Sequence, residues 1–207
     1  MGVIGELAEL VLPRHCAGCG EPGELLCVRC RRVLASPPVR VFPPTSPHVP
    51  VFALGPYAEA HRGVVLDMKE RDNLAVRRYV GAVLAAGLDY LEARGEIPVG
   101  AVLVPAPTRP SSARARGGDP VEQCCRAASR RVAPVLSLAE RTADQSELSA
   151  AARRANLSGA VRISGVPAGQ LIVVDDVVTT GATLAASAER LLAHGANVVA
   201  CVAVCVA

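Results

Sequence analysis

Two adjacent carboxylates, Asp175 and Asp176, follow four apolar residues in the segment LIVVDDVVTTGAT (171–183). The apolar run is typical of a buried strand, where a charge is costly unless it is paired or bound. The loop after the acids offers hydroxyls and backbone N–H groups at the start of a predicted helix, a combination that suits a phosphate. The loop residues are Thr179, Thr180, Gly181, Ala182 and Thr183. Because acids repel phosphate, we expect them to bind neighbouring hydroxyls, and the segment predicts a site for a ribose 5-phosphate group.

Four cysteines form two C-x-x-C pairs that are separated by seven residues: Cys16, Cys19, Cys27 and Cys30. Each pair can present two thiolates from one tight turn, and two such turns supply the ligands of a tetrahedral Zn²⁺. Four protein ligands leave no open position, so we expect a structural zinc ribbon. The alternative is that the four are reduced thiols without a metal.

The segments around these residues alternate between predicted strands and helices. Strands are expected at 51–57, 99–107, 133–140, 160–163, 171–175 and 197–207, and helices at 2–12, 61–69, 74–94, 120–131, 149–156 and 183–195. Helices between continuously apolar strands predict an α/β fold with a parallel sheet that is covered on both faces. Ligands of such sheets bind beyond the carboxyl ends of the strands, which is where the two acids stand.

Composition limits the kinds of partner and compartment. The chain of 207 residues has a net charge of +3 and only five Phe and Tyr residues, with no Trp, so neither charge nor stacking demands a nucleic acid. We find no signal peptide and no apolar run long enough to span a membrane, and we expect a cytoplasmic protein. We divide the chain into an N-terminal helix and ribbon (1–36), a proline-rich connector (37–50) and the α/β domain (51–207).

The segment LIVVDDVVTTGAT resembles the binding motif for phosphoribosyl diphosphate (PRPP) in type I phosphoribosyltransferases. The Cys-rich ribbon, LDMKERDN (66–73), VLVPAPTRPSSARARG (102–117) and RTADQSELSAAARRANLSGAV (141–161) occur in the order seen in ComF-type proteins. The resemblance covers nearly the whole chain. It implies a phosphoribosyltransferase fold for 51–207 and a family-level link to DNA uptake in natural transformation.

The resemblance also implies roles for residues. Asp175 and Asp176 would bind the ribose hydroxyls, and the loop from Thr179 to Thr183 would hold the 5-phosphate. The turn formed by Pro105, Ala106 and Pro107 would approach the diphosphate, Mg²⁺ would arrive with PRPP, and Arg116 would stabilise the leaving group from the loop RARG (114–117). The chain departs from the family at Gly118-Asp119-Pro120, where Phe-Asn-Gln is usual.

Lys69 is the single lysine beside 21 arginines. We interpret it as a compact ammonium aimed at the diphosphate, and the alternative is chance retention. The function expected from these residues is that of a phosphoribosyltransferase with an unidentified acceptor. The alternative is a PRPP-sensing or DNA-processing accessory protein that contacts single-stranded DNA or the uptake machinery through arginine clusters such as Arg77/Arg78 and Arg130/Arg131.

Overall fold

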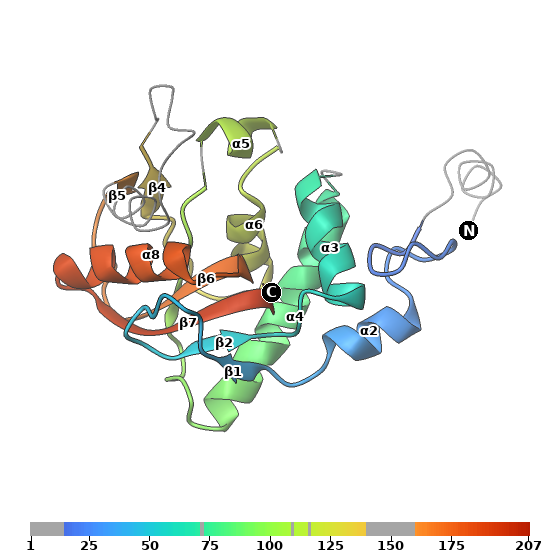
Figure 1. Cartoon of the computed structure of the whole chain (residues 1–207), viewed down its shortest axis with the longest axis horizontal. Helices are drawn as coiled ribbons and strands as arrows, with labels where there is room; N and C mark the ends of the chain where they lie inside the picture. Colours follow the sequence, from blue (N-terminus) through green and yellow to red (C-terminus); the bar gives the residue numbers. More distant parts are fainter. Residues whose placement is uncertain (1–14, 71–72, 109, 116, 140–159) are drawn as a thin grey trace.

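The computed structural model describes residues 15–70, 73–108, 110–115, 117–139 and 160–207. In this part of the chain, five strands form a main sheet in the order β1-β2-β7-β6-β3 (Figure 1). The strands are β1 (Val39–Val41), β2 (Val51–Ala53), β3 (Val102–Pro105), β6 (Gln170–Val178) and β7 (Asn197–Val206). All neighbours are parallel except β1, which pairs antiparallel with β2 at the edge. The predicted α/β fold with a mostly parallel sheet is confirmed.

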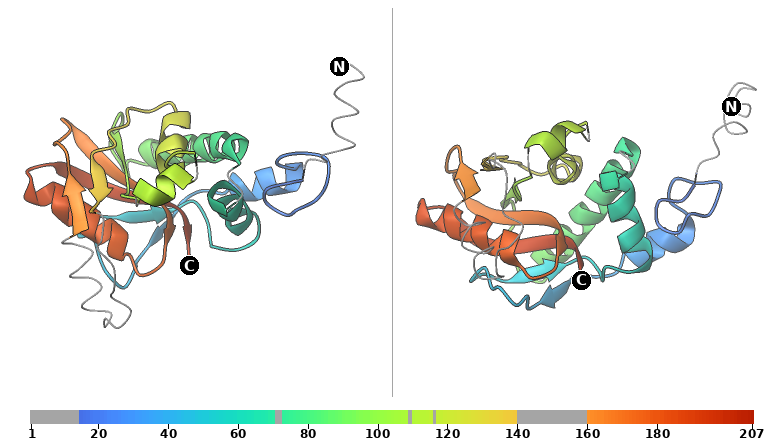
Figure 2. Two further views of the ribbon diagram at one scale, coloured as in Figure 1. Left: turned by 90° about the horizontal axis from the view of Figure 1, so that it is seen from above. Right: turned by 45° about the horizontal axis from the view of Figure 1, so that its top comes forward.

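Helices cover both faces of this sheet (Figure 2). They are α2 (Val28–Leu34), α3 (Glu59–Glu70), α4 (Leu74–Ala93), α5 (Pro110–Ala115), α6 (Pro120–Ala127) and α8 (Ala182–Ala193). Leucines of α8 share one core cluster with Val173 of β6, whereas leucines of α4 share another with Val174. Two short strands, β4 (Leu136–Leu138) and β5 (Val161–Ile163), pair antiparallel beside the α8 face.

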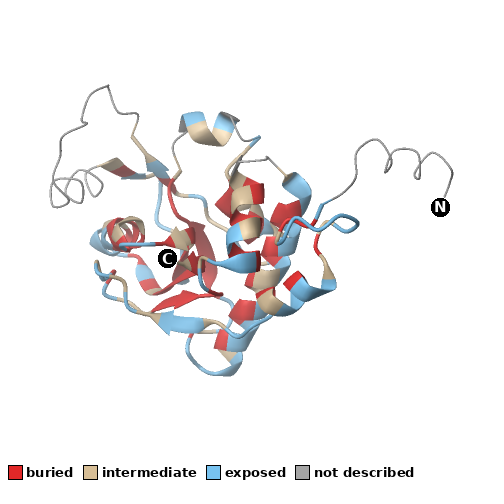
Figure 3. Cartoon of the chain, turned by 45° about the vertical axis from the view of Figure 1, so that its right-hand side comes forward, coloured by how far each residue is buried: buried red, intermediate tan, exposed pale blue. Residues whose placement is uncertain are grey.

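Buried residues concentrate on the sheet and on the helix faces turned toward it (Figure 3). Residues 171–174 of β6 are all buried, as their continuous apolar character predicts for a strand that is covered on both sides. The strand runs further than expected, to Val178, so Asp175 and Asp176 lie inside β6 and not after it. Pairing with β7 holds this extension, since Val177 and Val178 lie opposite Cys205 and Val206.

Two segments that were predicted to be irregular contain regular structure. The proline-rich connector includes β1, because Val39 to Val41 alternate in a way that suits an edge strand, and prolines are tolerated at such edges. The polar loop before residue 119 contains the short helix α5. The helices predicted at 2–12 and 149–156 lie outside the described residues.

No helix among the described residues combines the length and the apolar character that crossing a membrane requires.

Candidate functional site

Strand β6 carries Asp175 and Asp176 toward opposite faces of the sheet. Successive side chains of a strand alternate between faces, and the two preceding valines show which face is which. Val173 packs in the cluster under α8, and Val174 packs in the cluster under α4 and α6. The Asp175 side chain therefore lies on the same face of the sheet as α8, and the Asp176 side chain lies on the face where α3 lies. The two carboxylates can approach a ligand at the strand end from its two sides.

Asp176 forms an ion pair with Lys69, the next-to-last residue of α3. The Lys69 Nζ lies 2.6 Å from Asp176 Oδ2, and the Asp176 side chain is only 12% exposed. An ammonium and a carboxylate at this distance form a charge-assisted hydrogen bond. The sequence led us to expect an ammonium directed at a diphosphate, and the structure adds a carboxylate partner for it. Lys69 and Asp176 are thus brought together from segments more than a hundred residues apart.

The surroundings of Asp175 shift its pKa upward. Burial, followed by the negative charge of Asp176, raises the pKa of Asp175 from 3.8 to about 8. The backbone N–H of Asp176 donates to Asp175 Oδ1 at 2.9 Å and opposes this rise only in part. Near neutral pH, the raised pKa favours the protonated form of Asp175. The pair of Asp175 and Asp176 can then both donate and accept hydrogen bonds.

The loop between β6 and α8 contains a glycine in a left-handed conformation. Gly181 has φ +80°, a left-handed conformation in which side chains are strained, and it directly precedes α8. Thr179 and Thr180 are exposed, and Thr180 Oγ1 accepts from the Ala182 N–H at 3.4 Å. The N–H groups and hydroxyls of Thr179 to Thr183 thus gather at the amino end of a twelve-residue helix.

The proline-rich connector lies against this loop, which the sequence analysis missed. The Thr45 N–H donates to the Thr180 carbonyl at 2.8 Å. A Cβ on Gly181 would lie 2.4 Å from the Thr45 carbonyl oxygen and 2.7 Å from Pro43 Cβ. Gly181 is therefore required by its φ angle and by the close approach of the connector. A run of prolines shows that a segment is extended, but not which surface it crosses.

The turn after β3 reaches the same edge of the sheet. Pro105 pairs with Val174, and the Ala106 N–H donates to the Val174 carbonyl at 2.7 Å. Pro105, Ala106 and Pro107 are all buried and run beside β6 as far as Asp175. The described part of the predicted site is thus assembled from α3, the turn after β3, β6 and the start of α8. Arg116 lies outside the described residues.

The departure from the family at Gly118-Asp119-Pro120 has a local structural reason. Asp119 caps α6, because its Oδ1 accepts from the N–H groups of Val121 at 2.8 Å and Glu122 at 3.1 Å. Pro120 occupies the first helical position, where its missing N–H costs no hydrogen bond. The three residues start a helix, and an Asp followed by Pro is a signal for this that the sequence analysis did not use.

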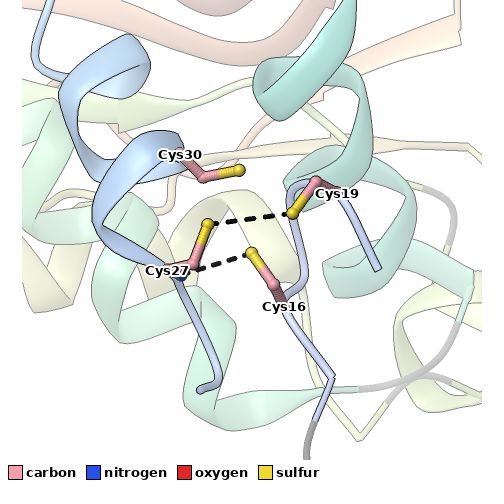
Figure 4. Close-up of side chains that lie close together, drawn as sticks. All are labelled: Cys16, Cys19, Cys27 and Cys30. Atoms are coloured by element: carbon pink, nitrogen blue, oxygen red, sulfur yellow. Dashed lines mark hydrogen bonds between the residues drawn. The ribbon is translucent and has the colours of Figure 1, made fainter. Parts of the chain in front are cut away.

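The four predicted cysteine ligands converge at one point (Figure 4). Their sulfur atoms all lie within 4.8 Å of one another, and Cys19 Sγ lies 3.7 Å from Cys27 Sγ. In a tetrahedral Zn²⁺ site with Zn–S bonds of about 2.3 Å, the sulfurs are about 3.8 Å apart. The cluster of Cys16, Cys19, Cys27 and Cys30 therefore fits a zinc ion.

Backbone amides prepare this cluster for a cation. Burial alone would raise the pKa of the Cys16 thiol, but N–H groups of Cys27, Cys19 and Gly18 directed at its sulfur lower it to about 6. The Cys27 N–H lies 3.3 Å from Cys16 Sγ. Thiolates are the form that binds metal, so this arrangement favours binding near neutral pH.

The ribbon is packed on α3. Cys16, Ala17 and Cys30 share a core cluster with Val64 and Met68 of that helix. A Cβ on Gly63 would lie 2.2 Å from the Gly18 carbonyl oxygen, so the two backbones approach closely. The helix that carries Lys69 is thus supported on one side by the cysteine cluster.

Several arginines that were considered for DNA contacts have other partners. Arg77 is 1% exposed and cannot reach a phosphate from the surface. Arg130 forms ion pairs with Asp89 and Glu92. The expectation that Arg77/Arg78 and Arg130/Arg131 act as DNA-contacting pairs is therefore wrong for one member of each pair, because their guanidinium groups are engaged within the protein.

Comparison with known proteins gives a partial sequence match and loose structural matches. No family model matches the chain. It is 49% identical over 59 residues to the DNA utilization protein YhgH of Escherichia coli O157:H7 and 48% identical over 59 residues to that of Salmonella typhi. The matched segment covers 28% of this chain and spans only 26% of the length of these relatives.

Two solved structures superpose on part of the chain. A hypoxanthine phosphoribosyltransferase from Staphylococcus aureus is 14% identical and has a TM-score of 0.34, covering 65% of this chain and 63% of its own. The enzyme from Trypanosoma cruzi is 17% identical and has a TM-score of 0.33, covering 65% of this chain and 67% of its own.

Proposed function

We propose that the chain binds phosphoribosyl diphosphate or a related ribose 5-phosphate ligand and acts as a phosphoribosyltransferase of the ComF type. The observation that carries the proposal is the arrangement near the end of β6: two adjacent carboxylates, one of them in an ion pair with Lys69, lie shortly before a loop with a left-handed glycine at the start of α8. The resemblance of residues 171–183 to the PRPP motif supports the same ligand.

The two carboxylates suit adjacent ribose hydroxyls. A hydroxyl is both a donor and an acceptor; a carboxyl oxygen of Asp176 can accept from it, and Asp175, whose pKa is raised, can donate to it while it holds its proton. The loop from Thr179 to Thr183 would bind the 5-phosphate through its N–H groups and hydroxyls, with the positive end of α8 behind it. Lys69 would hold Asp176 in place through their ion pair and would add positive charge beside the leaving diphosphate.

The turn at Pro105 to Pro107 borders Asp175 and would lie next to the anomeric side of the ribose. Mg²⁺, when bound, would supply charge neutralisation for the diphosphate, held by ligand oxygens more than by the protein. In a transferase, the bond from the ribose to the diphosphate breaks as positive charge develops on the sugar, and fixed charges such as Lys69 and Asp176 favour that separation. The acceptor nucleophile is not assigned.

Calorimetric titration of PRPP with Mg²⁺ tests the ligand. The wild type should bind, the double variant Asp175→Asn/Asp176→Asn should not, and Glu96→Gln, which neutralises an exposed acid, should bind as the wild type does. All three proteins should be zinc-loaded and shown to be folded. A folded wild type that does not bind PRPP would refute the proposal.

A second candidate function is favoured by the relatives that are named for DNA utilization. In this alternative, the chain is a PRPP-sensing or DNA-processing accessory protein that contacts single-stranded DNA or a protein partner. Contacts to phosphates make DNA affinity fall steeply with salt. Anisotropy of a labelled single strand, measured over a salt series with and without PRPP, would detect such binding, and no binding at low salt would exclude the DNA part.

A further inference from the structure

Arg77 is a buried cation that the proposed chemistry does not use. Its side chain is among the largest fully buried ones, with 1% of its surface exposed. A buried guanidinium is costly unless its donors are satisfied, so its contacts indicate what it holds. Those contacts join three elements that border the candidate site.

The first contact is with the end of α3. Arg77 Nε and Nη2 both donate to the Met68 carbonyl, at 3.3 and 3.1 Å. Met68 directly precedes Lys69, and the carbonyls in the last turn of a helix have no partner within the helix. The fork of the guanidinium therefore holds the peptide unit that joins Met68 to the lysine.

The second contact leads to α6 and the loop before it. Arg77 Nη1 donates to Gln123 Oε1 at 2.9 Å, and Gln123 Nε2 donates to the Gly117 carbonyl at 3.1 Å. Gly117 is the last residue of the RARG segment (114–117). One guanidinium thus connects the end of α3, through Gln123, to Gly117 in the loop before α6.

The start of α4 adds a parallel connection. Asn73 Nδ2 donates to Asp67 Oδ2 at 2.7 Å, and the Asn73 side chain also caps α4 by accepting from Val76 N at 3.4 Å. Two successive residues of the last turn of α3, Asp67 and Met68, are therefore tied to α4. Lys69 is the next residue along the chain, so these hydrogen bonds restrict the position from which its side chain extends.

We propose that Arg77 is a positioning residue: it holds the last turn of α3 so that the Lys69 ammonium contacts Asp176, and it joins this turn to Gly117 through Gln123. The contacts themselves are independent of any ligand. The consequence for ligand binding rests on the proposed function, because it matters only if Asp176 receives a ribose hydroxyl.

The single lysine of the chain makes the effect measurable without a ligand. Reductive methylation with ¹³C-formaldehyde labels Lys69 and the α-amine, and the two dimethylamines give separate NMR signals. The variants are Arg77→Met, which keeps length and removes all the donors, and Arg78→Met, the same change at the exposed neighbour. Met is chosen because a lysine replacement would introduce a second amine.

Lys69 in Arg77→Met should be methylated roughly three- to tenfold faster than in the wild type, as expected when a charge-assisted contact is weakened. The rate in Arg78→Met should not change, and the rate of the α-amine should be the same in all three proteins. A folded Arg77→Met with the wild-type rate at Lys69 would overturn the proposal. If Arg77→Met does not fold, Gln123→Met is the test variant, because it removes the contact with Gln123 and leaves the hydrogen bonds from Arg77 to Met68. Methylation of Lys69 should then be accelerated by a smaller factor. An unchanged methylation rate in folded Gln123→Met would overturn the proposal.

Titration of PRPP with Mg²⁺ into the same variants separates the two proposals. Weaker binding by Arg77→Met together with faster methylation supports both the positioning role and its consequence for the ligand. If the wild type does not bind PRPP, the proposed function fails, while the methylation rates still test the positioning of Lys69.

Discussion

Replacing Asp175 with asparagine should stabilise the protein at alkaline pH and flatten the pH dependence of its free energy of unfolding. Burial and the charge of Asp176 raise the pKa of Asp175 from 3.8 to about 8. A carboxyl whose pKa is higher in the folded state contributes stability that is fully present below the unfolded-state pKa and is lost as the pH rises through the folded-state pKa. The wild type should thus lose stability between these two values, whereas asparagine has no proton to release.

The size of the effect follows from the two pKa values. At pH values between the two pKa values, only the unfolded chain has released the proton. In this range the free energy of unfolding falls by about 1.4 kcal/mol for each pH unit. Between about pH 6 and about pH 9, linkage gives a loss of roughly 2 to 3 kcal/mol from this one group. This range avoids acid conditions that would protonate the cysteine ligands of a metal. Other groups titrate in both proteins, so the difference between the two profiles isolates Asp175.

Urea unfolding of the zinc-loaded wild type and Asp175→Asn at several pH values across this range measures the difference. Glu96→Gln serves as the matched control, because it removes the charge of an exposed acid and should follow the wild type. If the profiles of the wild type and Asp175→Asn run parallel, Asp175 is already ionised at neutral pH. The raised pKa of Asp175 would then be refuted.

Two further predictions concern the segments around the site. Asp119→Ala removes the cap of α6 and should lower the free energy of unfolding, measured with urea, by about 0.5–2 kcal/mol. Asp119→Ser, which keeps a capping oxygen, should retain most of the wild-type stability. Equal stability of Asp119→Ala and the wild type would contradict the capping role. Removing zinc with a chelator should lower the melting temperature of the wild type, because the ribbon shares a core cluster with α3. The decrease should be smaller in Gly63→Ala, because the added Cβ would meet the Gly18 carbonyl and already weaken the packing of the ribbon on α3. An unchanged melting temperature of the chelated wild type would show that the ribbon does not support the domain.

The sequence predicted the parts of the molecule that local patterns determine. The apolar run before Asp175 identified the buried strand β6, and the apolar spacing from Leu74 identified α4, because both patterns match the period of their element. The two C-x-x-C pairs predicted a cluster of four sulfurs, which the structure shows. In each case the residues that interact are close in the sequence or share one periodic face.

Contacts between distant segments could not be read in this way. Nothing near Lys69 indicates that its partner is Asp176, and nothing in the connector indicates that Thr45 lies on Thr180. Arg77 looked like a surface residue because it is adjacent to Arg78, yet its position on the inner side of α4 buries it. Helix periodicity could have suggested this, since Arg77 lies one residue from Val76 and three from Val80, which are both buried.

The position of β7 has a consequence for how the protein is made. Although β7 is the last strand along the chain, it lies between β2 and β6, and within the main sheet it alone links β1 and β2 to β6 and β3. While a ribosome is still synthesising residues 197–206, the strand that carries Asp175 and Asp176 has one unpaired edge. The sheet can close only after this segment leaves the exit tunnel, so the two acids reach their final surroundings only after the strand that pairs with β6 has been made.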